Sequence, residues 1–158
     1  MKWVMNDHVH YDRVASLWAI RRFVDPEAEI SFAPRATPLE ELPQDATLLG
    51  FHGVKLGMHD DEGTMFLKVL REYHLDDPAL QLIEEVIKKG VEYVLHDYRP
   101  PADDRYGQMG VGLAAMADGM MILESSDAER LERSFVVWDA MYELFKANKQ
   151  RGVAAPAD

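Results

Sequence analysis

The fold is decided at residues 3–32, which read WVMNDHVHYDRVASLWAIRRFVDPEAEISF. The stretch opens on a short apolar run that ends at an Asn-Asp pair, as a brief strand would. Apolar residues then recur at helical spacing up to Asp25-Pro26, where the proline disfavours a helical conformation in the residue before it. From residue 29 apolar and polar residues alternate, which predicts a second strand. A strand, a helix and a strand in this order predict a βαβ unit with parallel strands.

Beyond this unit the sequence predicts one more strand, at residues 47–51, and then helices. Asp77 before Pro78 has the pattern of an N-cap, and Ser126 with Glu129 has that of a capping box. We therefore predict an α/β or α+β fold, in which a small, mostly parallel sheet with a βαβ start precedes a helical carboxy-terminal two thirds. Residues 1–150 should form a single domain and residues 151–158 a flexible tail.

The last helix carries one apolar seam and a second apolar face. The seam is Leu131, Phe135, Trp138, Tyr142 and Phe145, and the second face is Val137, Met141 and Leu144. Such a helix is either buried between layers or used to form a homodimer. The methionines of the Ala-rich segment 107–124 are expected to fill the core.

Composition excludes several functions. The chain has 158 residues and 17 Lys+Arg against 28 Asp+Glu, a net charge of −11, so nucleic acid and membrane surfaces are unlikely partners. It has no cysteine, so any metal must be bound by nitrogen and oxygen. Charge and histidine follow within a few residues of the amino terminus, which predicts a cytoplasmic protein without a signal peptide.

Histidines stand beside carboxylates at several places in the chain. His8 follows Asp7, His10 lies two residues before Asp12, and His59 and His96 each precede an aspartate. Imidazole and carboxylate together are the usual ligands of Zn, Mn and Fe. We therefore hypothesise a divalent transition-metal site with His10, His59 and His96 as its ligands. Asp12 and Asp97 would be additional ligands or would orient the histidines, and His8 is a further candidate ligand.

The position of the first group supports this hypothesis. His8 and His10 lie between a strand and a helix, where α/β sheets gather their ligands, and alternate residues of an extended segment point the same way. Asp12 is either a metal ligand or the N-cap of its helix; in the second case asparagine would replace it with little loss. Arg13, in a helical first turn, is a candidate for binding an oxyanion. Exposed turns and helix ends are the structural alternatives for residues 59–63 and 96–97.

These motifs resemble the carboxy-terminal domain of ChrB-type chromate-resistance proteins. The resemblance is carried by residues 10–28, His59, residues 75–80, His96-Asp97 and residues 129–142, and so spans nearly the whole chain. It implies a metal- or oxyanion-responsive domain connected with chromate resistance. Where family members often carry Cys and Glu after His59, this chain has Thr64 and Leu67, which excludes cysteine-dependent reduction of chromate. There is also an apparent insertion between Leu80 and His96.

The layout of histidine and aspartate is more remotely similar to DHH-type metal-dependent phosphoesterases, so two functions remain open. In the first, the metal and Arg13 recognise a small oxyanion, and a partner carries the output. In the second, the domain is an enzyme in which a metal-bound water attacks a phosphoester, with Asp60 or Asp61 as the catalytic base.

Overall fold

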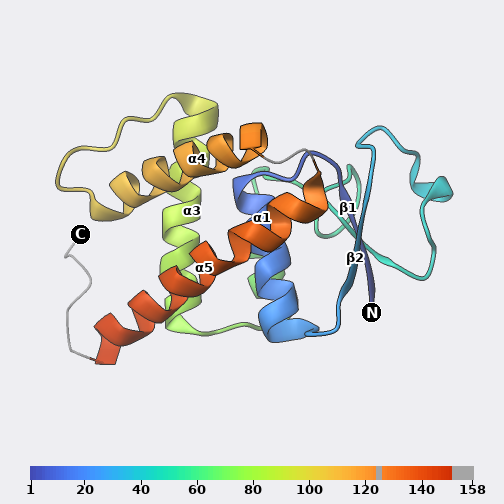
Figure 1. The fold of residues 1–158 in the computed structure, drawn as a ribbon, viewed down its shortest axis with the longest axis horizontal. Coiled ribbons are helices and arrows are strands. Elements are labelled where there is room, and N and C mark those ends of the chain that lie inside the picture. The colour runs from blue at the N-terminus through green and yellow to red at the C-terminus, as the bar shows by residue number, and fades with distance from the viewer. Residues whose placement is uncertain (124–125, 151–158) are drawn as a thin grey trace.

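The computed structural model describes residues 1–123 and 126–150 and has a three-stranded parallel sheet beside a group of helices (Figure 1). The strands are β1 (Lys2–Asn6), β2 (Glu29–Ala33) and β3 (Thr47–Leu49), in the order β2-β1-β3. In the register of the central strand, Trp3 pairs with Ile30 on one side and with Thr47 on the other. The predicted parallel sheet, βαβ start and helical remainder are confirmed.

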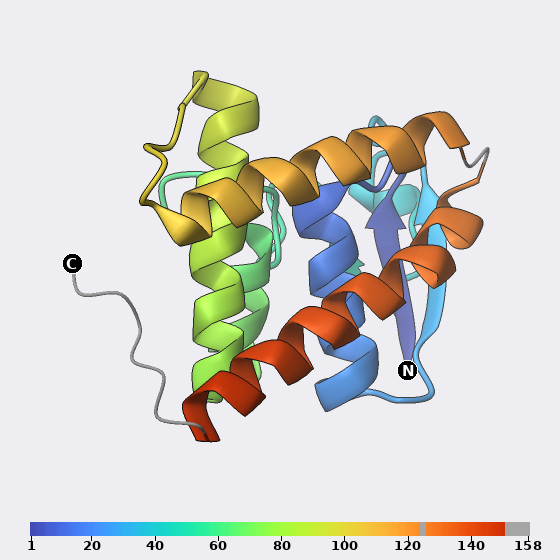
Figure 2. The same cartoon turned by 60° about the vertical axis from the view of Figure 1, so that its left-hand side comes forward.

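Helix α1 (Tyr11–Ala19) occupies the centre of the molecule, and a π-helical turn (Ile20–Val24) extends it to the predicted end at Asp25. Its residues are almost all buried, because the sheet covers one side and helices cover the others. These helices are α2 (Met65–Glu72), α3 (Pro78–His96), α4 (Arg105–Leu123) and α5 (Asp127–Gln150). In Figure 2, the end of α4 and the start of α5 lie close together. From there the two helices diverge toward α3, and α1 lies behind them.

Side-chain caps fix where three of these helices begin. The Asp77 carboxylate accepts a hydrogen bond from the Ala79 N–H at 2.8 Å, and the Ser126 hydroxyl accepts one from the Glu129 N–H at 3.2 Å. Both predicted caps are thus confirmed. The Thr64 hydroxyl accepts from the Leu67 N–H at 3.0 Å and so begins α2. Each cap satisfies an N–H group that a helix end otherwise leaves without a partner.

Helices α3 and α4 approach each other through glycine. A Cβ atom on Gly110 would lie 2.7 Å from the Val86 carbonyl oxygen, and one on Gly90 would lie 2.2 Å from the Tyr11 hydroxyl. That hydroxyl donates a hydrogen bond to the Val86 carbonyl at 3.1 Å. Glycine is therefore required at both positions, and Tyr11 joins the start of α1 to the α3–α4 crossing.

The predicted seam of α5 faces the core. Leu131, Trp138, Tyr142 and Phe145 are buried and Phe135 packs against the core. On the second face Met141 is buried and Leu144 is exposed, so burial between layers accounts for part of that face. The homodimer remains a prediction, and the predicted tail, residues 151–158, lies outside the described residues.

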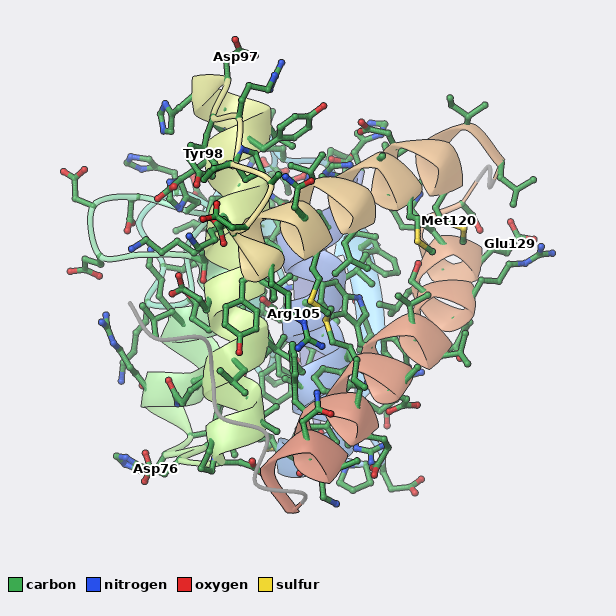
Figure 3. All side chains as sticks on the ribbon, turned by 90° about the vertical axis from the view of Figure 1, so that its left-hand side faces the viewer. Asp76, Asp97, Tyr98, Arg105, Met120 and Glu129 are labelled. Atoms are coloured by element: carbon green, nitrogen blue, oxygen red, sulfur yellow. The ribbon has the colours of Figure 1, made fainter. Side chains whose placement is uncertain are left out.

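Helix α4 is the least covered of the helices. Ile122 is 88% exposed and Met116 is also exposed, so the methionines of this helix do not all fill the core as expected. Figure 3 shows Met120 between α4 and α5. Within residues 1–123 and 126–150, no helix combines the length and the apolar composition that crossing a bilayer requires.

Candidate functional site

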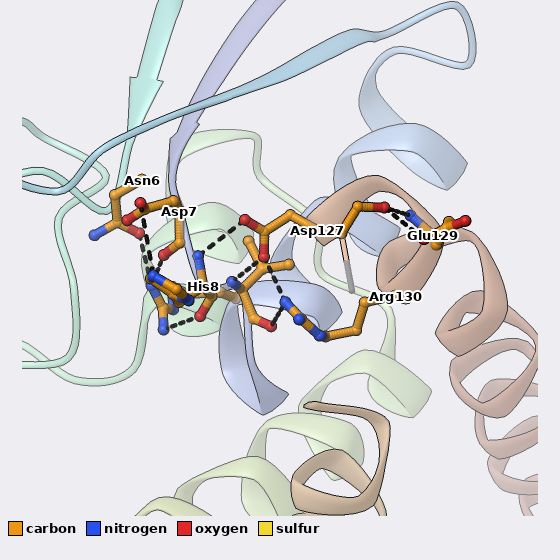
Figure 4. A network of polar contacts seen from close by, with 9 residues as sticks. Asn6, Asp7, His8, Asp127, Glu129 and Arg130 are labelled. Carbon is orange, nitrogen blue, oxygen red and sulfur yellow. Dashed lines mark hydrogen bonds and ion pairs between the residues drawn. The ribbon is translucent and has the colours of Figure 1, made fainter. Parts of the chain in front are cut away.

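The loop between β1 and α1 has an unusual backbone and is held by the distant helix α5 (Figure 4). His8 and Tyr11 have φ angles of +57° and +36°, in the left-handed region that non-glycine residues avoid. The Asp127 carboxylate accepts from the N–H groups of His8, at 2.9 Å, and Val9, at 2.7 Å. Arg130 donates to the Val9 carbonyl at 3.2 Å and pairs with Asp127 at 2.5 Å. The start of α5 thus stabilises a conformation that the loop would not adopt alone.

Arg13 holds the same loop from the inner side. Its guanidinium donates to the Asn6 side-chain oxygen at 2.8 Å and to the carbonyls of Asp7, at 3.0 Å, and His8, at 2.6 Å. Asn6 in turn donates to the Gly50 carbonyl at 2.6 Å, which joins the ends of β1 and β3. Three of the five N–H donors of Arg13 therefore have a structural role, and the others leave it some capacity to bind an anion.

A pocket of about 190 Å³ opens where the start of α1, the start of α2 and the last turns of α3 meet. It is lined by His10, Tyr11, Asp12, Arg13, Met58, His59, Met65, Val91, Val94 and Leu95. The pocket brings together four of the predicted site residues, from segments almost 50 residues apart in the sequence: His10, Asp12, Arg13 and His59. The other predicted residues do not line it: His8, Asp60, Asp61, His96 and Asp97.

Asp12 is buried and caps a different helix from its own. Its two carboxylate oxygens accept from the Met65 and Phe66 N–H groups, each at 2.9 Å, at the start of α2. The alternative that Asp12 is the N-cap of α1 is therefore wrong, since His10 occupies that position and makes no side-chain cap bond. Burial raises the pKa of the Asp12 carboxyl, while the two N–H donors and the charges of His59 and Arg13 oppose the rise.

His10 reaches from the pocket to α4. Its Nε2 atom lies 3.0 Å from the Asp118 carboxylate, which can accept only if Nε2 carries the hydrogen. In the neutral ring this leaves Nδ1 as the atom with a lone pair. Burial lowers the pKa of His10 against the raising effect of Asp118, so the ring is held in the neutral form that metals require.

Of residues 59–63, only His59 lines the pocket. The Asp60 carboxylate is bound to the Lys68 ammonium at 2.5 Å, and this bond holds the pKa of Asp60 below its usual range. Asp60 also accepts from the Glu62 N–H at 2.9 Å. Asp61 is exposed. Because Asp60 is stabilised as an anion in a salt bridge, it is poorly suited to take a proton from water.

His8, His96 and Asp97 lie apart from the pocket. The His8 side chain is 79% exposed and lies 3.8 Å from the Asp7 carboxylate, so the left-handed turn separates it from His10. His96 is the exposed last residue of α3, and Asp97 pairs with Arg99. Figure 3 shows Asp97 at the far end of α3, pointing outward.

Glu84 is a buried acid that sequence reasoning did not single out. Burial raises its pKa to about 8, and the hydroxyl of Thr64 lies 2.6 Å from its carboxyl group. The charge of Asp12 adds to the rise. The sequence does indicate that Glu84 is buried, because it falls on the apolar stripe of α3 between Leu80 and Ile87.

The pocket offers the right atoms for a metal, although they are not arranged as a formed site. Two imidazoles and one carboxylate suit Zn, Mn or Fe. Among the residues that the structure describes, however, no three His, Asp or Glu side chains are grouped closely enough to hold an ion. Binding would therefore require side chains to move closer together.

Comparison of the sequence with known families defines the class of this domain. The chain belongs to the ChrB C-terminal domain family, whose model matches residues 3–145. It is similar to Protein ChrB of Cupriavidus metallidurans, with 28% identity over 151 residues, which are 95% of this chain. The match covers 42% of the length of that relative. No solved structure matches the chain.

Proposed function

We propose that this domain takes part in chromate resistance by binding a small inorganic ligand in the pocket of His10 and His59. The ligand is a divalent transition metal (Zn, Mn or Fe) bound by the two imidazoles with Asp12 as the nearby carboxylate, and an oxyanion approaches through Arg13. The observation that carries the proposal is the convergence of His10, Asp12, Arg13 and His59 in one pocket.

The protonation states in the pocket favour a cation. The neutral His10 ring keeps a lone pair for the metal, and each oxygen of Asp12 keeps a second lone pair after accepting one N–H. Once bound, the metal would polarise an oxyanion or a water molecule. Arg13 would add hydrogen bonds to the oxyanion from its remaining donors.

The two bases proposed for the hydrolase alternative do not lie at this pocket. Asp60 is bound to Lys68, and neither Asp60 nor Asp61 lines the pocket. Asp12 is the only carboxylate among the lining residues described, and its two oxygens already accept backbone hydrogen bonds. Binding, with the response carried by a partner, is therefore the better supported function.

Calorimetric titration of the purified chain with Zn²⁺ and Mn²⁺ tests the proposal. His10→Ala and His59→Ala should each lower the metal affinity by about 10- to 100-fold or more. His52→Ala and His74→Ala are matched controls, since both histidines are exposed and lie outside the pocket, and they should bind as the parent does.

Two outcomes would contradict the proposal. One is the absence of any transition-ion binding tighter than about millimolar at neutral pH; the other is an equal loss in the control variants. Chromate should bind the metal-loaded chain more weakly after Arg13→Lys, because lysine cannot reproduce the planar donors of arginine. Steady hydrolysis of a phosphodiester with Mn²⁺ would instead establish the enzyme.

A further inference from the structure

The pocket of His10 and His59 has two chemically different walls. The polar wall is formed by His10, Asp12, Arg13 and His59, and the apolar wall by three residues of α3, Val91, Val94 and Leu95. Met58 and Met65 add further apolar side chains to the lining. Tyr11 completes the lining. A bare inorganic oxyanion needs contacts with the polar wall only. Sites for organic ligands, in contrast, combine an apolar lining with a few well-placed polar groups.

The apolar wall is anchored in the core and continues to the surface. Val91 is buried, while Val94 and Leu95 are 47% and 57% exposed. Residues 91, 94 and 95 lie three and four positions apart on α3, so they form one face of the helix. That face continues the buried interior as an uncovered apolar strip at the pocket edge, and covering it would be favourable in proportion to the area removed from water.

The size of the pocket also exceeds what a bare oxyanion fills. At about 30 Å³ for each water molecule in the liquid, 190 Å³ corresponds to about six waters. A tetrahedral oxyanion next to Arg13 would leave the space along Val94 and Leu95 to water. A ligand with an anionic head and an aliphatic or aromatic body would fill both parts.

We infer that the pocket binds an organic oxyanion, with the anionic head at the polar wall and an apolar body along Val91, Val94 and Leu95. This inference rests on the proposed function, because it takes the same pocket and the same head-group contacts. It adds the class of ligand. Asp12 does not oppose an anionic head strongly, since the two N–H groups at the start of α2 offset its charge.

A series of alkylphosphonates tests the inference, because the head group stays constant while the body grows. Titrating the metal-loaded chain with methyl-, propyl- and pentylphosphonate should show tighter binding at each step, up to about 4-fold per methylene at full burial. Leu95→Asn should flatten this dependence, so that pentylphosphonate loses much of its advantage over methylphosphonate. Leu123→Asn is the matched control, an exposed leucine on α4 outside the pocket, and it should keep the parent's dependence.

The outcomes separate this inference from the proposed function. If metal and methylphosphonate bind but affinity does not change along the series, the inference is wrong and the proposed function stands. An undiminished chain-length dependence in Leu95→Asn would also overturn it. If neither metal nor methylphosphonate binds, the proposed function fails and the inference fails with it. Both variants replace exposed side chains, and circular dichroism will show that each is folded.

Discussion

If Asp12 were the N-cap of its own helix, asparagine would replace it with little loss of stability. Because Asp12 binds the start of α2 instead, we expect Asp12→Asn to destabilise the protein far more. In the structure the carboxylate spans two N–H groups, those of Met65 and Phe66. Asparagine has one carbonyl oxygen to accept one of these hydrogen bonds. Its NH₂ group would face the other N–H, and a buried donor would then have no acceptor.

The size of the effect follows from these contacts. Losing one hydrogen bond to a charged acceptor costs about 1.5–3 kcal/mol, and losing the charge at the start of α2 costs about 0.3–1 kcal/mol more. The neutral side chain recovers part of this, because burial disfavours the charged form of Asp12. We expect a net loss of about 2–3 kcal/mol in the free energy of unfolding. For a chain of this length, this corresponds to a melting temperature lower by about 4–12 °C.

Urea and thermal denaturation followed by circular dichroism will measure this loss. Asp61→Asn is the matched control, since it makes the same chemical change at an exposed aspartate and should stay within about 0.5 kcal/mol of the parent. If Asp12→Asn is as stable as that control, the bidentate contact with α2 does not contribute as described, and the assignment of Asp12 to the start of α2 is refuted.

Three further predictions concern other contacts. The folded protein keeps a proton on Glu84 between the ordinary pKa of 4.5 and about 8, so the free energy of unfolding should fall as pH rises through this window. Glu84→Gln should remove this fall, and urea denaturation at several pH values will show whether it does. Gly90→Ala should destabilise by about 1–3 kcal/mol because its Cβ meets the Tyr11 side chain, whereas Gly112→Ala, with nothing within 4 Å of its Cβ, should stabilise by about 0.5–1 kcal/mol. Equal effects in thermal denaturation would contradict the close contact between Gly90 and Tyr11. Asp118→Ala should lower the pKa of His10 further, because the Asp118 carboxylate opposes the effect of burial on that pKa. An unchanged pKa of His10 in an NMR titration would show that this contact is not formed in solution.

The parts predicted from sequence are those that local chemistry determines. The βαβ start follows from the change in apolar period before and after Asp25, and the caps at Asp77 and Ser126 follow from residues within three positions of the helix start. His10 and His59 line one pocket, in agreement with their positions after predicted strands, and their role as metal ligands stays a prediction. The βαβ start and the caps depend on neighbours in the sequence.

The parts that sequence reasoning missed depend on distant contacts. The pairing of His8 with His10 assumed an extended segment, but Asp127 and Arg13 hold a left-handed turn there. Of the two alternatives for Asp12, the N-cap of its own helix is wrong, because its hydrogen-bond partners lie 53 and 54 residues later. His96 was expected beside the other ligands, yet neighbouring helical residues do not share a face, and the pocket takes Leu95 instead.

The hydrogen bonds from Asp127 and Arg130 to the β1–α1 loop affect the order in which the molecule folds. Every residue that lines the pocket lies before position 96, but the loop that carries His10 acquires its bonds from the start of α5. While the chain is being synthesised, the amino-terminal part can emerge and form its sheet before those bonds exist. The pocket would then be completed only when residues 127–130 have emerged and docked against this loop.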